Sequence, residues 1–288
     1  LIRKNVENML NIFTNADNKI SIKCLKDMTD ELYRELSKIL EFTLYDTFLN
    51  TIPFGYKLAY IYSQETCMNE LIESQYYQKF LDEIDTEFYL KLFEEYPVAL
   101  YLLSITVLKW LIRSKELLVR INLDKCLLEN FLDVQKIIAI GEVKSYNSDL
   151  HNQGRRTYIV GLVSDDGALN RVCYKPRSMM PDKFLFDFSH QIRTRNDKIR
   201  IRAAKFIDCQ SYGYTEFIDT KSEFDGTNQI NSKKIGELLF YLWILGANDC
   251  SKDNILFDGL DYVLIDCESL FQGSWILGND RFNNYDLD

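Results

Sequence analysis

Glycine and proline are scarce in this chain of 288 residues, which has 12 glycines and 4 prolines. That scarcity, beside 18 phenylalanines and 18 tyrosines, excludes collagen-like, low-complexity and disordered sequences. The 7 cysteines are an odd, scattered set, and neither a CxxC nor an HExxH pattern occurs. Zinc and redox motifs are therefore excluded. Dispersed thiols of odd number are typical of a reducing compartment, so we expect a cytoplasmic location.

Positive charge is also in deficit, because 34 basic residues face 43 acidic ones and leave a formal charge of −9. Duplex binding depends on neutralising phosphates, so we expect no nucleic acid partner. The longest apolar run, Tyr96 to Leu108, is interrupted by Ser104 and Thr106. It is shorter than the roughly 20 residues of a membrane span, and we interpret it as a buried helix with no membrane span. The chain begins at Leu1 without a signal-peptide pattern, which suggests a start further upstream.

The first part of the chain has helical periodicity as far as about Phe131. Leu32, Leu36 and Leu40 share one face, and Thr29 or Asp30 is available as the N-cap of their helix. Further stripes cover residues 71–84, 88–93 and 98–118, the last with Pro97 in its first turn. These patterns predict a mostly helical region.

After Asp133 the pattern changes to that of strands, with a helix over residues 232–245. Strands are predicted at 136–143, 157–163, 169–175, 199–207 and 262–265. Asp166-Gly167 between two of them is a hairpin signal. We therefore predict an α+β fold, with a helical region over 1–134, a β-rich part over 135–230 and a last part over 231–288.

Four polar residues in the second half have the order that phosphoryl transfer from ATP requires. Such transfer needs a cation on the phosphates, a carboxylate near the attacking hydroxyl and oxygen ligands for magnesium. Asp249 precedes Asn254 by five positions, and Asp266 ends the apolar strand Tyr-Val-Leu-Ile. Lys175 lies upstream at the end of a predicted strand. The interval of five residues between Asp249 and Asn254 is weak evidence alone, since the same interval recurs inside the predicted hairpin. Its combination with Lys175 upstream and Asp266 downstream predicts a nucleotide phosphotransferase.

Each of these residues also has an ordinary structural interpretation. Lys175 could be a surface lysine, but Pro176 fixes the backbone directly after it, and we favour the functional role. A carboxylate at Asp266 would be half-buried, which calls for a metal or a cation as its partner. For Glu268 we favour a structural pairing with an arginine over metal binding.

Two further features leave alternatives open. Glu216 could line the adenine side of the site or bridge the two lobes. A basic-rich region could be a solvated strand face, which we favour, or a landing surface for an acidic leader peptide or for phosphate as it forms. Its members are Arg177, Arg193, Arg195, Arg200 and Arg202.

Five ordered motifs resemble the dehydratase domain of class II lanthipeptide synthetases, the LanM type. They are D-L-H-N-Q-G-R from Asp149, Y-K-P-R from Tyr174, Y-G-Y-T-E-F-I from Tyr212, the segment around Asp249, and L-I-D-C-E-S-L-F from Leu264. The stretch L-F-E-E-Y-P before them is also similar, so the resemblance covers residues 88–272.

This resemblance implies a lipid-kinase-like bilobal catalytic core with helical additions. It also implies use of ATP and Mg²⁺ to phosphorylate Ser and Thr of a precursor (leader-core) peptide, followed by elimination of the phosphate. The implied site is divided as follows: catalytic roles for Asp149, His151, Asp249 and Ser251, ATP contacts for Lys175 and Arg155, and magnesium ligation by Asn254 and Asp266.

Two departures from the family pattern bear on activity. Ser251 stands where the family has a histidine, so phosphorylation could be slower, rerouted through Asp249 or lost. The residues up to Asp288 include no counterpart of the family's elimination residues or zinc cyclase, so elimination and ring closure are not supported by these residues. The alternatives are therefore a pseudokinase-like scaffold that binds peptide or nucleotide, and a stand-alone kinase.

Overall fold

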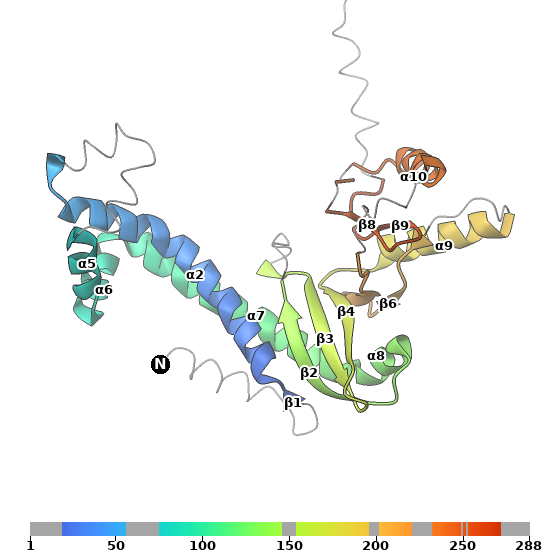
Figure 1. Cartoon of the computed structure of the whole chain (residues 1–288), viewed down its shortest axis with the longest axis horizontal. Coiled ribbons are helices and arrows are strands. Elements are labelled where there is room, and N and C mark those ends of the chain that lie inside the picture. The colour runs from blue at the N-terminus through green and yellow to red at the C-terminus, as the bar shows by residue number, and fades with distance from the viewer. Residues whose placement is uncertain are drawn as a thin grey trace, which may run out of the picture. The chain divides into compact units, whose positions relative to one another are not determined.

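The computed structural model describes residues 19–55, 75–145, 154–195, 202–220, 232–248, 250–251 and 253–271. They belong to two compact units. The helical unit comprises described residues of 22–122 together with residues 154 and 155. The sheet unit comprises those of 17–21, 123–151 and 156–288. Helices precede a sheet-containing region along the chain (Figure 1), so the predicted α+β class is confirmed.

Two long helices form the body of the helical unit. Helix α2 (Ile22–Thr51) and helix α7 (Pro97–Leu123) lie side by side (Figure 1). The indole Nε1 of Trp110 donates to the carbonyl of Met28 at 3.1 Å, and Tyr96 Oη donates to Asp46 at 2.6 Å. Because residue numbers rise along one helix as they fall along the other, the pair is antiparallel. Two shorter helices, α5 (Gln75–Asp82) and α6 (Thr86–Glu95), complete the described part of this unit.

Helix α7 is apolar on more than its packed face. Among the described residues it is the helix whose length and composition would allow a membrane span, and 22% of its apolar stretch is buried. Within the run Tyr96 to Leu108, Ala99 is buried, whereas Val98 and Tyr101 are exposed. The prediction of a helix is confirmed, but the prediction that this run is buried is wrong for most of its residues. Core helices of soluble proteins can have the same length and composition. One helix of this kind is therefore weak evidence for a membrane span.

The start of α2 differs from the prediction. The helix begins at Ile22, so Thr29 lies inside it and its hydroxyl donates to the carbonyl of Leu25 at 2.5 Å. The prediction of an N-cap at Thr29 or Asp30 is therefore wrong. Pro97 does begin α7, as predicted.

The sheet unit contains a large sheet in the order β1-β2-β3-β4-β7-β6. Its strands are β1 (Lys19–Ile20), β2 (Ile137–Lys144), β3 (Tyr158–Ser164), β4 (Leu169–Lys175), β6 (Phe206–Asp208) and β7 (Gly213–Glu216). The pair β1–β2 is parallel and the others are antiparallel. Gly167 adopts a φ of 84° in the turn between β3 and β4, which confirms the predicted hairpin. Figure 1 shows β2, β3 and β4 side by side.

A short helix, α8 (Lys125–Leu132), precedes β2 along the chain. Asp133 ends it in the left-handed conformation, with a φ of 54°. The predicted change from helix to strand therefore falls at this cap.

A smaller sheet of three strands carries the last part of the described chain. Its order is β5-β9-β8, with β5 (Arg202–Ala203), β8 (Ile255–Phe257) and β9 (Tyr262–Leu264). Helices α9 (Met180–Arg195) and α10 (Ser232–Ile244) share a core with it, in which Leu185, Leu242 and Leu264 are all buried. Burying each such side chain stabilises the fold by about 1.5–3 kcal/mol. This core fixes the end of β9 against the first half of α9.

Candidate functional site

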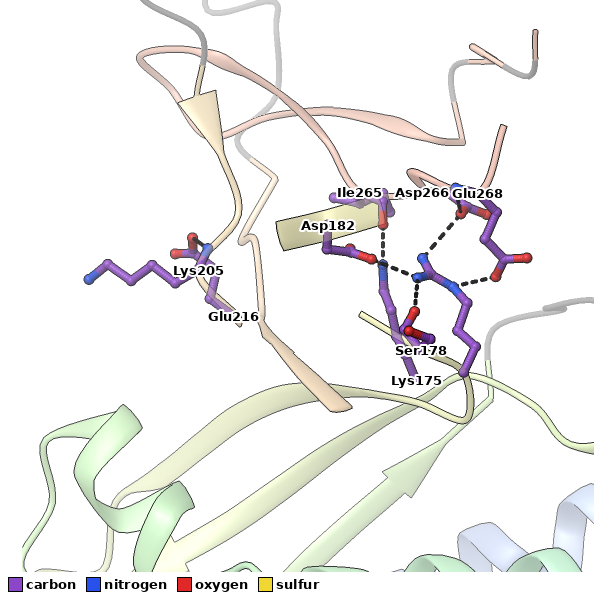
Figure 2. Close-up of polar contacts among 9 residues, drawn as sticks. Lys175, Ser178, Asp182, Lys205, Glu216, Ile265, Asp266 and Glu268 are labelled. Atoms are coloured by element: carbon purple, nitrogen blue, oxygen red, sulfur yellow. Dashed lines mark hydrogen bonds and ion pairs between the residues drawn. The ribbon is translucent and has the colours of Figure 1, made fainter. Parts of the chain in front are cut away.

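Lys175 is the last residue of β4, and its side chain is only 7% exposed. Its Nζ donates to Asp182 Oδ1 at 3.2 Å and to the carbonyl oxygen of Ile265. Figure 2 shows Lys175 and Asp182 directed toward each other, with Ile265 beside them. An ammonium buried without partners would be costly, and these two acceptors offset that cost. Lys175 is therefore held where β4, α9 and the end of β9 meet.

Arg177, two residues later, joins the same elements through all three guanidinium nitrogens. Nη1 donates to Asp182 Oδ2 at 2.6 Å and to the Ser178 carbonyl at 3.1 Å. Nη2 lies 3.4 Å from Asp266 Oδ1, and Nε pairs with Glu268. Burial lowers the pKa of Arg177, but the carboxylates of Asp182, Glu268 and Asp266 raise that pKa by more, so it ends above its ordinary value.

We name these five side chains the Lys175 cluster: Lys175, Arg177, Asp182, Asp266 and Glu268. Two positive charges face three negative ones, which leaves a formal charge of −1. Lys175, Arg177 and Asp182 are at most 12% exposed, whereas Asp266 and Glu268 are 39% and 38% exposed. The surplus negative charge therefore lies on the solvent side.

The position of Asp182 explains why it serves both cations. Asp182 lies in the first turn of α9, where the helix dipole favours a carboxylate. One of its oxygens accepts from Lys175 and the other from Arg177. A buried carboxylate is thereby fully paired, which its 6% exposure requires.

Asn254 and Ser251 form a turn next to the end of β9. The backbone N–H of Ile265 donates to the Asn254 carbonyl at 2.9 Å, so Asn254 lies opposite the residue that accepts from Lys175. The N–H of Asn254 donates to the Ser251 carbonyl at 3.0 Å, and Ser251 Oγ accepts from the N–H of Asp253 at 3.3 Å. The structure thus brings Lys175, Asp266 and the backbone of Asn254 together.

The other predicted site residues do not join this group in the described part of the chain. Arg155 belongs to the helical unit, where its Nε donates to Glu116 at 2.7 Å. Asp149, His151 and Asp249 lie outside the described residues.

The donors present fit magnesium better than a metal held wholly by protein. Among the described residues, no group of three or more His, Cys, Asp or Glu side chains could hold a metal ion. Mg²⁺ usually binds one or two carboxylates together with substrate phosphates and waters. Both contacts of Asp266 with described residues use Oδ1, at 3.4 Å from Arg177 and 3.2 Å from the Glu268 N–H. Neither of these contacts uses Oδ2 of this half-exposed carboxylate.

The thiol next to Asp266 is excluded from the chemistry. Cys267 is 2% exposed, and burial, followed by the Asp182 carboxylate, raises its pKa to about 12. A thiol of that pKa is protonated near neutral pH and is a poor nucleophile. Cys267 is therefore part of the core.

Sequence reasoning missed Asp182 and assigned Arg177 to a basic surface. Helix α9 was not predicted, so the carboxylate in its first turn had no visible relation to Lys175. The available signal was Pro181 just inside the helix start, with an acidic residue next to it. Arg177 is buried in ion pairs, so the prediction of a solvated face is wrong for this residue. Arg193 and Arg195 are exposed, but on α9 rather than on a strand.

One of the structural alternatives is resolved, because Glu268 pairs with Arg177, as favoured from the sequence. The two options for Glu216 stay open. Glu216 accepts from Arg202 at 2.6 and 3.0 Å and from the Lys205 N–H at 2.6 Å, all within the sheet unit. Figure 2 shows Lys205 and Glu216 apart from the Lys175 cluster. Burial raises the pKa of Glu216, but these donors lower it by more, so it lies below its ordinary value.

Comparison with known proteins finds one family and one curated relative that are similar to this chain. The family described as "Domain of unknown function (DUF4135)" matches residues 96–286, a range that includes the whole Lys175 cluster. A curated protein of Lactococcus lactis subsp. lactis, "Lacticin 481/lactococcin biosynthesis protein LcnDR2", is 24% identical over 267 residues. That alignment covers 86% of this chain but only 28% of the relative's length.

Proposed function

This chain belongs to the DUF4135 family, and from that premise we propose that it uses ATP and Mg²⁺ to phosphorylate Ser and Thr of a precursor peptide. This step is the first half of lanthipeptide dehydration in the family that the motifs resemble. The name of the lactococcal relative, a lacticin 481/lactococcin biosynthesis protein, supports a peptide substrate. Because the chain spans only 28% of that relative, elimination and ring closure are not included in the proposal. ATP as phosphate donor is consistent with a cytoplasmic location.

One observation carries the proposal: the Lys175 ammonium donates to the carbonyl of the residue directly before Asp266. Lys175 and Ile265 lie 90 positions apart in sequence. The phosphotransferase prediction needs Lys175 and Asp266 to lie close together in the fold. A strand lysine beside a carboxylate that follows a short apolar strand is what phosphoryl transfer from MgATP needs.

The support of Lys175 is also suited to phosphate binding. Protein kinases hold their strand lysine with a helix glutamate, and Asp182 on α9 holds Lys175 in a similar manner. An ammonium has three N–H donors, and two are used by Asp182 and Ile265. The third donor is left for a phosphate oxygen of ATP.

We assign magnesium ligation to Asp266 and the Asn254 side chain, on the chemistry of their oxygens. Magnesium, when bound, would neutralise charge on the transferring phosphoryl group and orient it. Asp249 would accept the proton of the peptide hydroxyl. The hydroxyl oxygen then forms a bond to the γ-phosphorus, the bond from that phosphorus to the β–γ bridging oxygen breaks, and ADP leaves with that electron pair.

The test is incubation of the protein with ATP, Mg²⁺ and a candidate precursor peptide, followed by mass spectrometry of the peptide. We expect a mass gain of one or more phosphates, which Lys175→Met abolishes. Lys183→Met is the matched control, because Lys183 lies on α9 but is exposed and pairs with the exposed Asp187. If wild type leaves a range of precursors unchanged and Lys175→Met has the same affinity for MgATP as wild type, the enzyme proposal is refuted.

A second candidate is a scaffold that binds peptide or nucleotide without turnover. Ser251 favours it, because its hydroxyl closes a turn at Asp253 and has no cationic form to act as a histidine would. Thermal unfolding in MgATP separates the two candidates, since a ligand at 100 times its dissociation constant adds about 2.7 kcal/mol of stability. Stabilisation without phosphate transfer would establish the scaffold.

A further inference from the structure

We propose that Arg177 is a positioning residue that holds the Asp266 carboxylate in the orientation that receives Mg²⁺. This inference rests on the proposed function and deepens it, because it concerns the affinity of the same site for Mg²⁺. Neither the motif spacing nor the comparisons give Arg177 a role.

The first argument is the way the guanidinium divides its donors. Nη1, Nη2 and Nε each point to a different carboxylate, on Asp182, Asp266 and Glu268 respectively. The planar guanidinium fork fixes the angles between these directions. The orientation of Asp266 is therefore tied to two acids on either side of it, one in α9 and one after β9.

The second argument is the unequal strength of these contacts. Arg177 lies 2.6 Å from Asp182 but 3.4 Å from Asp266. Charge-assisted hydrogen bonds are normally near 2.7–2.9 Å, so the contact with Asp266 is the weaker one. Arg177 is thus anchored by Asp182 and Glu268, and it orients Asp266 without taking up its whole charge.

The third argument is the charge that remains. The cluster keeps a formal charge of −1, and Asp266 is 39% exposed with both of its contacts on Oδ1. A cation that reaches Oδ2 would meet a half-exposed carboxylate whose other oxygen is held by Arg177. Partners of this kind, which orient a ligand without touching the metal, typically change metal affinity by about 10- to 100-fold when mutated.

The test measures the Mg²⁺ requirement of Arg177→Lys. Thermal unfolding is followed during MgCl₂ titration at a fixed concentration of a non-hydrolysable ATP analogue. Lysine keeps the charge but not the fork, so we expect the Mg²⁺ midpoint to rise by about tenfold or more. In the phosphate-transfer assay, the Mg²⁺ concentration for half-maximal rate should rise likewise, and saturating Mg²⁺ should restore most of kcat.

Arg202→Lys is the matched control. Arg202 likewise pairs with more than one carboxylate, those of Glu216 and Asp258, but outside the Lys175 cluster. It should lower the melting temperature without moving the Mg²⁺ midpoint. A midpoint for Arg177→Lys that equals that of wild type, or of Arg202→Lys, overturns the inference.

A second variant guards against a folding defect. If Arg177→Lys does not fold, Glu268→Gln removes one anchor at a half-exposed position and should raise the midpoint in the same direction. An unchanged midpoint in Glu268→Gln then overturns the inference. Failure of the proposed function looks different, because wild type itself would then show no stabilisation by Mg²⁺ with the nucleotide.

Discussion

Replacing Asp182 by asparagine tests whether this carboxylate stabilises the buried cations of the Lys175 cluster. The substitution keeps the shape of the side chain and removes its charge. Among the described residues, Lys175, which is 7% exposed, would lose its carboxylate partner and keep the Ile265 carbonyl. Arg177 would still have the Asp266 and Glu268 carboxylates. The loss therefore falls mainly on Lys175.

The expected magnitude follows from that division. Breaking one partner out of a buried ion pair costs about 3–5 kcal/mol, because it leaves a buried charge uncompensated. Since Arg177 keeps two of its three carboxylates, we expect a value near the lower end, about 3 kcal/mol. The double variant Asp182→Asn with Lys175→Met removes the orphaned charge and should recover about 2 kcal/mol relative to additivity.

Urea unfolding followed by far-UV circular dichroism measures these free energies. Asp187→Asn is the control, because Asp187 pairs with Lys183 on the same helix with both side chains more than half exposed. Its cost should stay below about 0.5 kcal/mol. A loss under about 1 kcal/mol for Asp182→Asn, with additive behaviour in the double variant, would refute a stabilising role for the buried pair.

Three further outcomes are expected from the described contacts. The pKa of Glu216 lies below its ordinary value because of Arg202, so its stabilising contribution is present above the unfolded pKa and is lost as pH falls through the folded pKa. Urea midpoints measured from neutral pH to below pH 4 should therefore fall less steeply in Glu216→Gln than in wild type. Gly213→Ala should destabilise the protein by about 1–3 kcal/mol in urea unfolding, since the new Cβ would lie 2.3 Å from the Ile207 carbonyl oxygen. Cys267, with its pKa raised to about 12, should resist iodoacetamide in the folded protein near neutral pH, while the exposed cysteine of α8 reacts, and peptide mass mapping checks both.

Local patterns predicted the elements whose boundaries depend on neighbouring residues. The strand at 169–175 and the start of α7 at Pro97 agree with the structure, because hairpin and first-turn chemistry are local. The start of α2 could not be predicted. Ser21 just before it donates its N–H to the Ile140 carbonyl at 2.9 Å and its hydroxyl to the Gly141 carbonyl at 2.5 Å. Partners about 120 positions away leave no signal in a short window of sequence.

The site shows the same division between local and distant information. The residue types and order predicted that Lys175 and Asp266 belong together, and the structure brings them together through Ile265. The acid that holds Lys175 was not predicted, because the aromatic residues of α9 hide its helical periodicity. Three of its aromatic residues, Phe184, Phe186 and Phe188, alternate as they would on a strand. The roles assigned to Asp149, His151 and Asp249 stay predictions.

Two residues between β2 and β3 bear on how this protein can be shortened. Gly154 and Arg155 lie between two strands of the sheet unit, yet they belong to the helical unit. There the Gly154 carbonyl accepts from Arg113 at 3.4 Å, and Arg155 pairs with Glu116. A shortened version that deletes the helices would strip both residues of these anchors in the middle of a motif.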